Sequence, residues 1–248
     1  MLARYLCLML FFVNAYALAE TPLLQMASLE ACRYDDVLTP LQAFEAWPYT
    51  LLDPIYRLEA SYEPPDLLSL AEAGFPKDLT KDLAREFRLR ALVMDDLKEL
   101  MSAAKAAGNP IALQSAYRSY GYQEKTFDYW VKLQGYEAAL RSSARPGHSE
   151  HQLGTAIDFR SEGGPAPWDL ADWAQSPAGA WMKENAWRYG FVMSYPDYPE
   201  SQRILSCYDY EPWHYRYVGR EVARAIQESG LSLRAWLWGY QGAYQGAY

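Results

Sequence analysis

The sequence predicts an α+β domain, because it holds both helical patterns and short strand-like segments. Four segments are typical of helices: 85–107, 121–134, 178–189 and 221–228. Segments typical of strands lie at 111–117, 155–159, 191–195 and 213–218. Half of the 248 residues are hydrophobic and 22% are charged, which is ordinary for a soluble globule with a sizeable core.

The first of these helices is the most regular. Its apolar positions recur at steps of three and four residues: Leu89, Leu92, Val93, Leu97, Leu100 and Ala104. Gly108-Asn109-Pro110 ends the pattern, because glycine and proline do not continue a helix. The strand at 111–117 follows directly and leads to Arg118. In the 178–189 helix, Gly190 is the expected C-terminal cap.

Charge and composition exclude some partners. The formal net charge is −8 and no basic run occurs, so a nucleic-acid partner is not expected, since phosphates are bound by lysine and arginine. The 21 tyrosines and 9 tryptophans suit a cleft for a peptide or a sugar.

The N-terminus is typical of a signal peptide. Arg4 supplies a positive charge, residues 5–13 form a short apolar core, and Ala17-Leu18-Ala19 matches a cleavage site, which predicts cleavage before Glu20. The alternative is an uncleaved anchor, but the apolar run is short for a membrane span. We therefore expect a protein exported to the periplasm or cell envelope, with no transmembrane segment after cleavage.

The three histidines of the chain, His148, His151 and His214, fall in two short stretches that also hold acidic residues. Imidazole is a common ligand of divalent metals, and a carboxylate such as that of Asp158 supplies a harder ligand. Two histidines and one aspartate would leave a tetrahedral position open for water, and Glu211 lies where it could take a proton. Taken singly, each residue could equally be a satisfied polar side chain or a turn cap.

Two motifs carry a resemblance to a known family. Ser149-x-His151-x-x-Gly154-x-Ala156-x-Asp158 is followed by Glu211-Pro212-Trp213-His214-Tyr215-Arg216-Tyr217-Val218-Gly219. Together they resemble the VanY-type D-alanyl-D-alanine carboxypeptidases, zinc peptidases of bacterial cell-wall peptides. The similarity runs from about 51 to about 219. It implies a single domain over 51–230, in which a central, mostly antiparallel sheet carries the zinc site and helices flank it.

The resemblance also implies roles for individual residues. His151, Asp158 and His214 would bind one zinc ion per chain, and Glu211 would be the general base. Ser115-Ala116-Tyr117-Arg118-Ser119 with Gln123 resembles a further family motif. It makes Arg118 a catalytic and substrate-binding residue, with Gln123 and Ser149 as substrate contacts. His148 is then surplus, a residue of the cleft or one that supports the ligands.

The function implied is removal of the C-terminal D-alanine from peptidoglycan stem peptides, which would be the substrate. The same site could instead serve an L,D-carboxypeptidase or an endopeptidase of cross-linked peptidoglycan. A non-catalytic wall-binding protein has no need of Glu211. A structural metal site usually has four protein ligands, whereas three residues fit here.

Two regions lie outside the resemblance, an N-terminal extension at 20–50 and the segment 231–248. The latter ends in a repeated Gln-Gly-Ala-Tyr, for which we expect a flexible or loosely docked tail. Signal cleavage would leave two cysteines, Cys32 and Cys207, and Ser206-Cys207 replaces a Thr-Gly pair common in the family. In an exported protein this suggests a Cys32–Cys207 disulfide, with two buried free thiols as the alternative.

Overall fold

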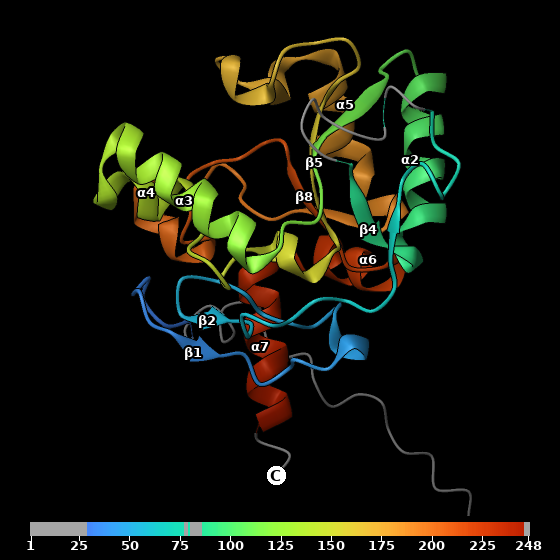
Figure 1. The fold of residues 1–248 in the computed structure, drawn as a ribbon. Helices are drawn as coiled ribbons and strands as arrows, with labels where there is room; N and C mark the ends of the chain where they lie inside the picture. Colours follow the sequence, from blue (N-terminus) through green and yellow to red (C-terminus); the bar gives the residue numbers. More distant parts are fainter. Residues whose placement is uncertain (1–28, 77–78, 80–85, 246–248) are drawn as a thin grey trace, which may run out of the picture.

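A four-stranded sheet forms the centre of the structure, a computed structural model that describes residues 29–76, 79 and 86–245. Its order is β5 (Ile111–Ser115), β6 (Ala156–Ser161), β8 (His214–Tyr217) and β7 (Phe191–Met193). Each neighbouring pair is antiparallel. The predicted α+β fold with a mostly antiparallel sheet is confirmed (Figure 1).

The two faces of this sheet differ in character because successive side chains of a strand point to opposite sides. Ile157 and Phe159 of β6 and Tyr215 of β8 belong to the main hydrophobic core. The residues between them, Asp158 and His214, belong to the other face. One face is thus anchored by apolar packing while the other carries polar groups.

Helices cover the core face and flank the polar one. Their bounds are α2 Met94–Ala106, α3 Tyr120–Gln134, α4 Tyr136–Ser142, α5 Pro177–Asn185, α6 Arg220–Ser229 and α7 Leu233–Gln245. Leu97 of α2 and Met182 of α5 are fully buried in the main core. A separate small cluster joins α3 and α4, which form a lobe of their own (Figure 1).

The first helix begins later than its pattern predicts. Arg88–Arg90 forms strand β4, which pairs antiparallel with β3 (Leu67–Ser69), and α2 starts only at Met94. The backbone N–H of Arg90 donates to the Gly154 carbonyl. These partners are distant in sequence, so tertiary hydrogen bonding overrides the local helical spacing of Leu89 and Leu92.

The N-terminal extension and the C-terminal helix pack together beneath the sheet domain (Figure 1). Strands β1 (Val37–Leu38) and β2 (Tyr56–Arg57) pair in parallel. Asp53 accepts a hydrogen bond from the Arg234 guanidinium at 2.8 Å, and both side chains are buried. The tyrosine rings of residues 49 and 240 stack with centroids 4.0 Å apart.

The repeated Gln-Gly-Ala-Tyr at 240–248 is therefore not flexible where the structure describes it, because 240–245 form the end of helix α7; 246–248 lie outside the described residues. Residues Leu233 and Leu237 of α7 are buried against Leu51 and helix α6. Burial of this apolar face stabilises a helix that the sequence repeat does not suggest.

A disulfide joins Cys32 to Cys207 across 175 residues of sequence. The bridge suggested by the cysteine count is thus present in the structure. It ties the N-terminal extension to the loop that leads to Glu211.

His148 does not lie where the sequence suggested. Its ring is fully buried, with Nδ1 2.8 Å from the Asp53 carbonyl oxygen and Nε2 3.0 Å from the Asp36 carboxylate. It therefore anchors the N-terminal extension and lies outside the cleft described below. Burial lowers the pKa of His148, although the hydrogen bond to Asp36 opposes this shift.

The predicted signal peptide, 1–19, lies outside the described residues. Within the part of the chain that the structure describes, no helix has the length and apolarity needed to cross a bilayer.

We expect loss of the disulfide to destabilise the protein. Replacing both Cys32 and Cys207 by serine should lower the free energy of unfolding by up to about 5 kcal/mol, because the unfolded chain regains loop entropy. Urea denaturation of the oxidised protein and the double variant measures the change. Recovery of both cysteines as free-thiol peptides from unreduced protein would contradict the bridge.

We expect His148 to make stability depend on pH. Its folded-state pKa is lowered, so below about pH 6.5 the unfolded chain binds a proton that the folded protein resists. The free energy of unfolding should therefore fall more steeply with acidification in the wild type than in His148→Gln. Urea titrations at pH 7.5, 6.5 and 5.5 test this; equal slopes would show that His148 contributes nothing.

Candidate metal centre and cleft

A single 3₁₀ turn, Glu150–Leu153, presents His151. The turn ends at Gly154, whose φ of 71° lies in the left-handed region that favours glycine. A Cβ on Gly154 would lie 2.9 Å from Leu67 Cδ2 and 3.0 Å from Arg90 Cγ. Glycine at this position allows the chain to turn tightly against β3 and β4 and to enter β6 directly after His151.

Strand pairing brings the other two residues together. Asp158 of β6 and His214 of β8 are direct partners in the antiparallel register. Directly opposite residues on one face of a sheet have neighbouring side chains. The two strands therefore join residues that are 56 positions apart in sequence.

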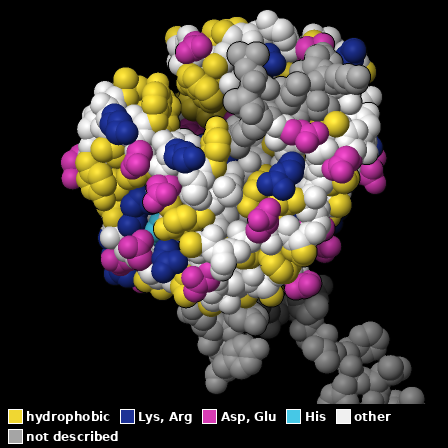
Figure 2. Space-filling view, in the orientation of Figure 1, with side chains coloured by type: hydrophobic (Ala, Val, Ile, Leu, Met, Phe, Trp, Pro, Cys, Tyr) yellow, Lys and Arg dark blue, Asp and Glu magenta, His cyan; other side chains and the backbone are white. Residues whose placement is uncertain are grey.

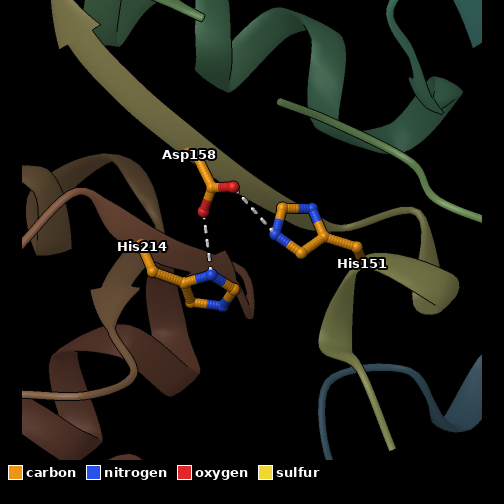
Figure 3. Close-up of side chains that lie close together, drawn as sticks. All are labelled: His151, Asp158 and His214. Atoms are coloured by element: carbon orange, nitrogen blue, oxygen red, sulfur yellow. Dashed lines mark hydrogen bonds and ion pairs between the residues drawn. The ribbon is translucent and has the colours of Figure 1, made fainter. Parts of the chain in front are cut away.

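Asp158 lies between the two imidazoles (Figure 3). Its Oδ1 is 3.0 Å from His214 Nδ1, and its Oδ2 is 3.3 Å from His151 Nε2. One ligand atom from each of the three residues lies within 4.8 Å of the others, and all three side chains are buried. The structure thus brings together the three residues expected to bind a metal.

The contacts of His151 fit a cation at its Nε2. Its Nδ1 lies 2.7 Å from the Ala116 carbonyl oxygen, so Nδ1 carries the proton and donates it. Nε2 is buried and faces the Asp158 carboxylate at 3.3 Å, with no other hydrogen-bond partner among the described residues. Burial, followed by the charge of Arg118, lowers the pKa of His151 to about 4, so the ring is neutral and its Nε2 lone pair is free for a metal.

His214 and Asp158 each shift the pKa of the other. Burial alone would lower the pKa of His214, but hydrogen bonds to the Asp158 and Glu150 carboxylates raise it to about 10 without a metal. Burial likewise opposes ionisation of Asp158, yet His151 and His214 hold its pKa well below the usual range. A metal ion would displace a proton from His214, since a histidine ligand binds through a free lone pair.

Glu211 borders this cluster. Its Oε2 is 3.8 Å from His214 Nδ1, and its side chain remains 19% exposed to the cleft. Burial raises the pKa of Glu211 to about 7, and the negative charges of Asp158 and Asp209 add to the shift. A carboxylate with this pKa can both accept and release a proton near neutral pH.

Arg118 approaches from the end of β5. Its guanidinium Nη2 is 3.9 Å from Asp158 Oδ2, and its backbone N–H donates to the His151 carbonyl. The positive charge therefore lies beside the metal-binding cluster, at the edge of the cleft.

The cleft has a volume of about 400 Å³. Figure 2 shows an indentation of the surface between the α3–α4 lobe and the part of the molecule at the top of the view. Its lining includes Tyr122 and Trp130 of α3, and Trp168 and Trp213, whose rings pack edge to face. The floor carries all of the predicted site residues except His151: Arg118, Gln123, Ser149, Asp158, Glu211 and His214.

Gln123 and Ser149 are both nearly fully buried at this floor. Gln123 Nε2 donates to the Ala144 carbonyl at 2.7 Å, while its Oε1 has no hydrogen-bond partner among the residues described. The amide is thus held in one orientation with an acceptor available.

Glu150 is a further polar group of the site, and its sequence position alone does not predict this. Its carboxylate accepts hydrogen bonds from Ser194 Oγ and from Arg216 Nη1, and it lies 3.0 Å from His214 Nε2. Strand alternation was a usable signal for Arg216, since it places this residue on the same face of β8 as His214. No sequence signal distinguishes Glu150 from its neighbours.

Comparisons with known proteins place this sequence in a family. The family model VanY, D-alanyl-D-alanine carboxypeptidase, matches residues 86–220. The chain is 37% identical over 184 residues to YodJ of Bacillus subtilis (strain 168), covering 74% of this chain and 64% of YodJ. The chain thus spans less than two thirds of that relative.

Solved structures share the fold. The LdcB LD-carboxypeptidase aligns with a TM-score of 0.63 and 34% identity, over 75% of this chain and 85% of LdcB. A vancomycin resistance D,D-pentapeptidase VanY in complex with Zn(II) aligns with a TM-score of 0.60 and 29% identity, over 77% and 99% of the two chains. Because the family model covers more than half of its residues, this chain belongs to the VanY family of D-alanyl-D-alanine carboxypeptidases.

Proposed function

We propose that this protein is a zinc-dependent carboxypeptidase that removes the C-terminal D-alanine from peptidoglycan stem peptides. The observation that carries the proposal is the buried His151–Asp158–His214 cluster, of which Asp158 and His214 line an open cleft together with Glu211. Membership of the VanY family and the Zn(II) complex of a related structure support the same chemistry.

His151, Asp158 and His214 are the proposed ligands of one zinc ion. Two imidazole nitrogens and a carboxylate oxygen are a donor set typical of catalytic zinc. When bound, zinc would polarise the scissile carbonyl and make water more acidic. Only these three residues form such a group in the described part of the chain, which supports a catalytic site rather than a structural site closed by four protein ligands.

Glu211 is the proposed general base. Its carboxylate takes a proton from the water that attacks the scissile carbonyl carbon, and then gives this proton to the departing amine of D-alanine. A pKa near 7 suits both transfers, because the group is neither too weak a base nor too weak an acid at neutral pH. A wall-binding protein without activity has no use for this carboxylate.

Arg118 is the proposed electrostatic stabiliser. Its permanent positive charge near Asp158 would stabilise the oxyanion of the tetrahedral intermediate. The same guanidinium could also bind the carboxylate of the substrate. Gln123 supplies an acceptor for a substrate N–H, and Ser149 supplies a hydroxyl at the same floor. Both are proposed substrate contacts.

A second candidate is an L,D-carboxypeptidase, which acts on a shortened stem. The observation that favours it is the similarity to the LdcB LD-carboxypeptidase, at 34% identity. An endopeptidase of cross-linked stems would use the same ligands and base. These activities differ in which residues of the peptide substrate lie on either side of the scissile bond.

The proposed substrate lies in the cell wall, so the proposal includes export. A signal peptide at 1–19 would direct the chain to the periplasm or cell envelope, leaving an extension at 20–50 before the catalytic domain at 51–230. The disulfide between Cys32 and Cys207 supports an oxidising compartment.

The test of this function is mass spectrometry of purified pentapeptide and tetrapeptide stems after incubation with the zinc-loaded protein. We expect loss of one D-alanine from the pentapeptide, abolished by a chelator. Glu211→Gln should lower the rate by about 10²- to 10⁴-fold while zinc remains bound, because only the proton transfer is lost.

Cleavage of the tetrapeptide alone would favour the L,D-carboxypeptidase. If neither stem is cleaved, cross-linked dimers supply the endopeptidase substrate. A zinc-loaded protein that cleaves none of these would contradict a hydrolytic function.

Arg118→Ala should reduce kcat/KM by about 10²- to 10³-fold, because one charge that stabilises the transition state is lost. The matched control is Arg224→Ala, which removes an exposed arginine on α6. Steady-state kinetics on the preferred stem peptide measures both variants. Near-normal turnover in Arg118→Ala would rule out the assigned role.

A further inference from the structure

Glu150 is a buried carboxylate that contacts one of the proposed metal ligands, His214. Its Oε2 lies 2.5 Å from Ser194 Oγ and 3.0 Å from His214 Nε2, and its Oε1 lies 3.1 Å from Arg216 Nη1. The residue is 2% exposed. A buried charge requires such partners, so the position of this carboxylate is determined on both oxygens.

The two nitrogens of His214 face different surroundings. Nδ1 faces Asp158, at 3.0 Å, and Glu211, at 3.8 Å. Nε2 faces Glu150, on the side away from these groups. Since Asp158 also approaches His151 Nε2, the other metal-binding atoms lie on the Nδ1 side of the ring.

The imidazole of His151 is oriented by a backbone group and not by a carboxylate. His151 donates from Nδ1 to the Ala116 backbone carbonyl, which is neutral. His214 instead faces a full negative charge. A carboxylate on the remote nitrogen fixes the tautomer and increases the basicity of the nitrogen that binds metal.

We propose that Glu150, held by Arg216 and Ser194, is a positioning residue that keeps His214 protonated at Nε2 and leaves Nδ1 to bind the metal. This inference rests on the proposed function, because it concerns the same zinc site. It adds a group that acts through His214 and does not touch the substrate.

The competing explanation is a purely structural ion pair between Glu150 and Arg216. Arg216 also donates to the Trp47 carbonyl at 2.6 Å, so the pair could serve to join the sheet to the N-terminal extension. A structural pair predicts a loss of stability when it is broken, with no change in zinc affinity once the protein is folded.

The variant that separates these explanations is Glu150→Gln. The amide keeps the shape of the side chain but removes its negative charge from His214. We expect the dissociation constant for zinc to rise by about 10- to 100-fold, as is typical when such a partner is lost. Competition with a chromophoric chelator measures the constant on the full protein, independently of turnover.

The matched control is Asp53→Asn. Asp53 is also a buried carboxylate paired with an arginine, Arg234, but it has no contact with the metal cluster. We expect this variant to unfold at lower urea concentration while its zinc affinity stays at the wild-type value. Equal zinc affinities of Glu150→Gln and wild type would overturn the inference.

A second measurement needs no variant. In the zinc-loaded wild type, long-range ¹H–¹⁵N correlation spectra should show His214 with its proton on Nε2. Zinc bound through Nε2 would overturn the inference even if Glu150→Gln did not fold. A wild-type protein that binds no zinc would overturn both this inference and the proposed function, whereas bound zinc with unchanged affinity in the variant would overturn only the former.

Discussion

The antiparallel pairing of β6 with β8 is the constraint on which the site depends. Its register places Asp158 opposite His214, and its core face is held by Ile157, Phe159 and Tyr215. A shift of one residue would turn the polar side chains into the core and the apolar ones into the cleft. Apolar packing on one face thus determines the metal-binding geometry on the other.

Burying so many charges beside one another is costly, and the structure compensates for it locally. Glu150 is paired with Arg216 and Asp158 with the two imidazoles, while Glu211 at the margin keeps the raised pKa of a desolvated carboxyl. Removing one partner of a buried pair typically costs about 3–5 kcal/mol, because the other charge is left uncompensated. The metal-binding residues and Glu150 thus each have a charged partner, whereas desolvation dominates at Glu211, the group proposed to move protons.

The segments outside the family similarity complete the domain. The Cys32–Cys207 bridge and the His148–Asp36 contact join the N-terminal extension to the sheet domain, and the Asp53–Arg234 pair joins the start of that domain to α7. Each contact joins residues far apart in the chain. The extension is therefore part of the scaffold that holds the site from below.

The sequence by itself determined the fold class, the residues that form the metal cluster, Glu211 and the cysteine pair. It could do so because rare side chains concentrate in two motifs, and because only two cysteines remain after the predicted signal cleavage. Only the tertiary structure decided the contacts of Glu150 and His148, the strand at Arg88–Arg90 and the helical state of α7. These features depend on burial and on partners distant in sequence, and neither leaves a periodic or compositional signal in the chain.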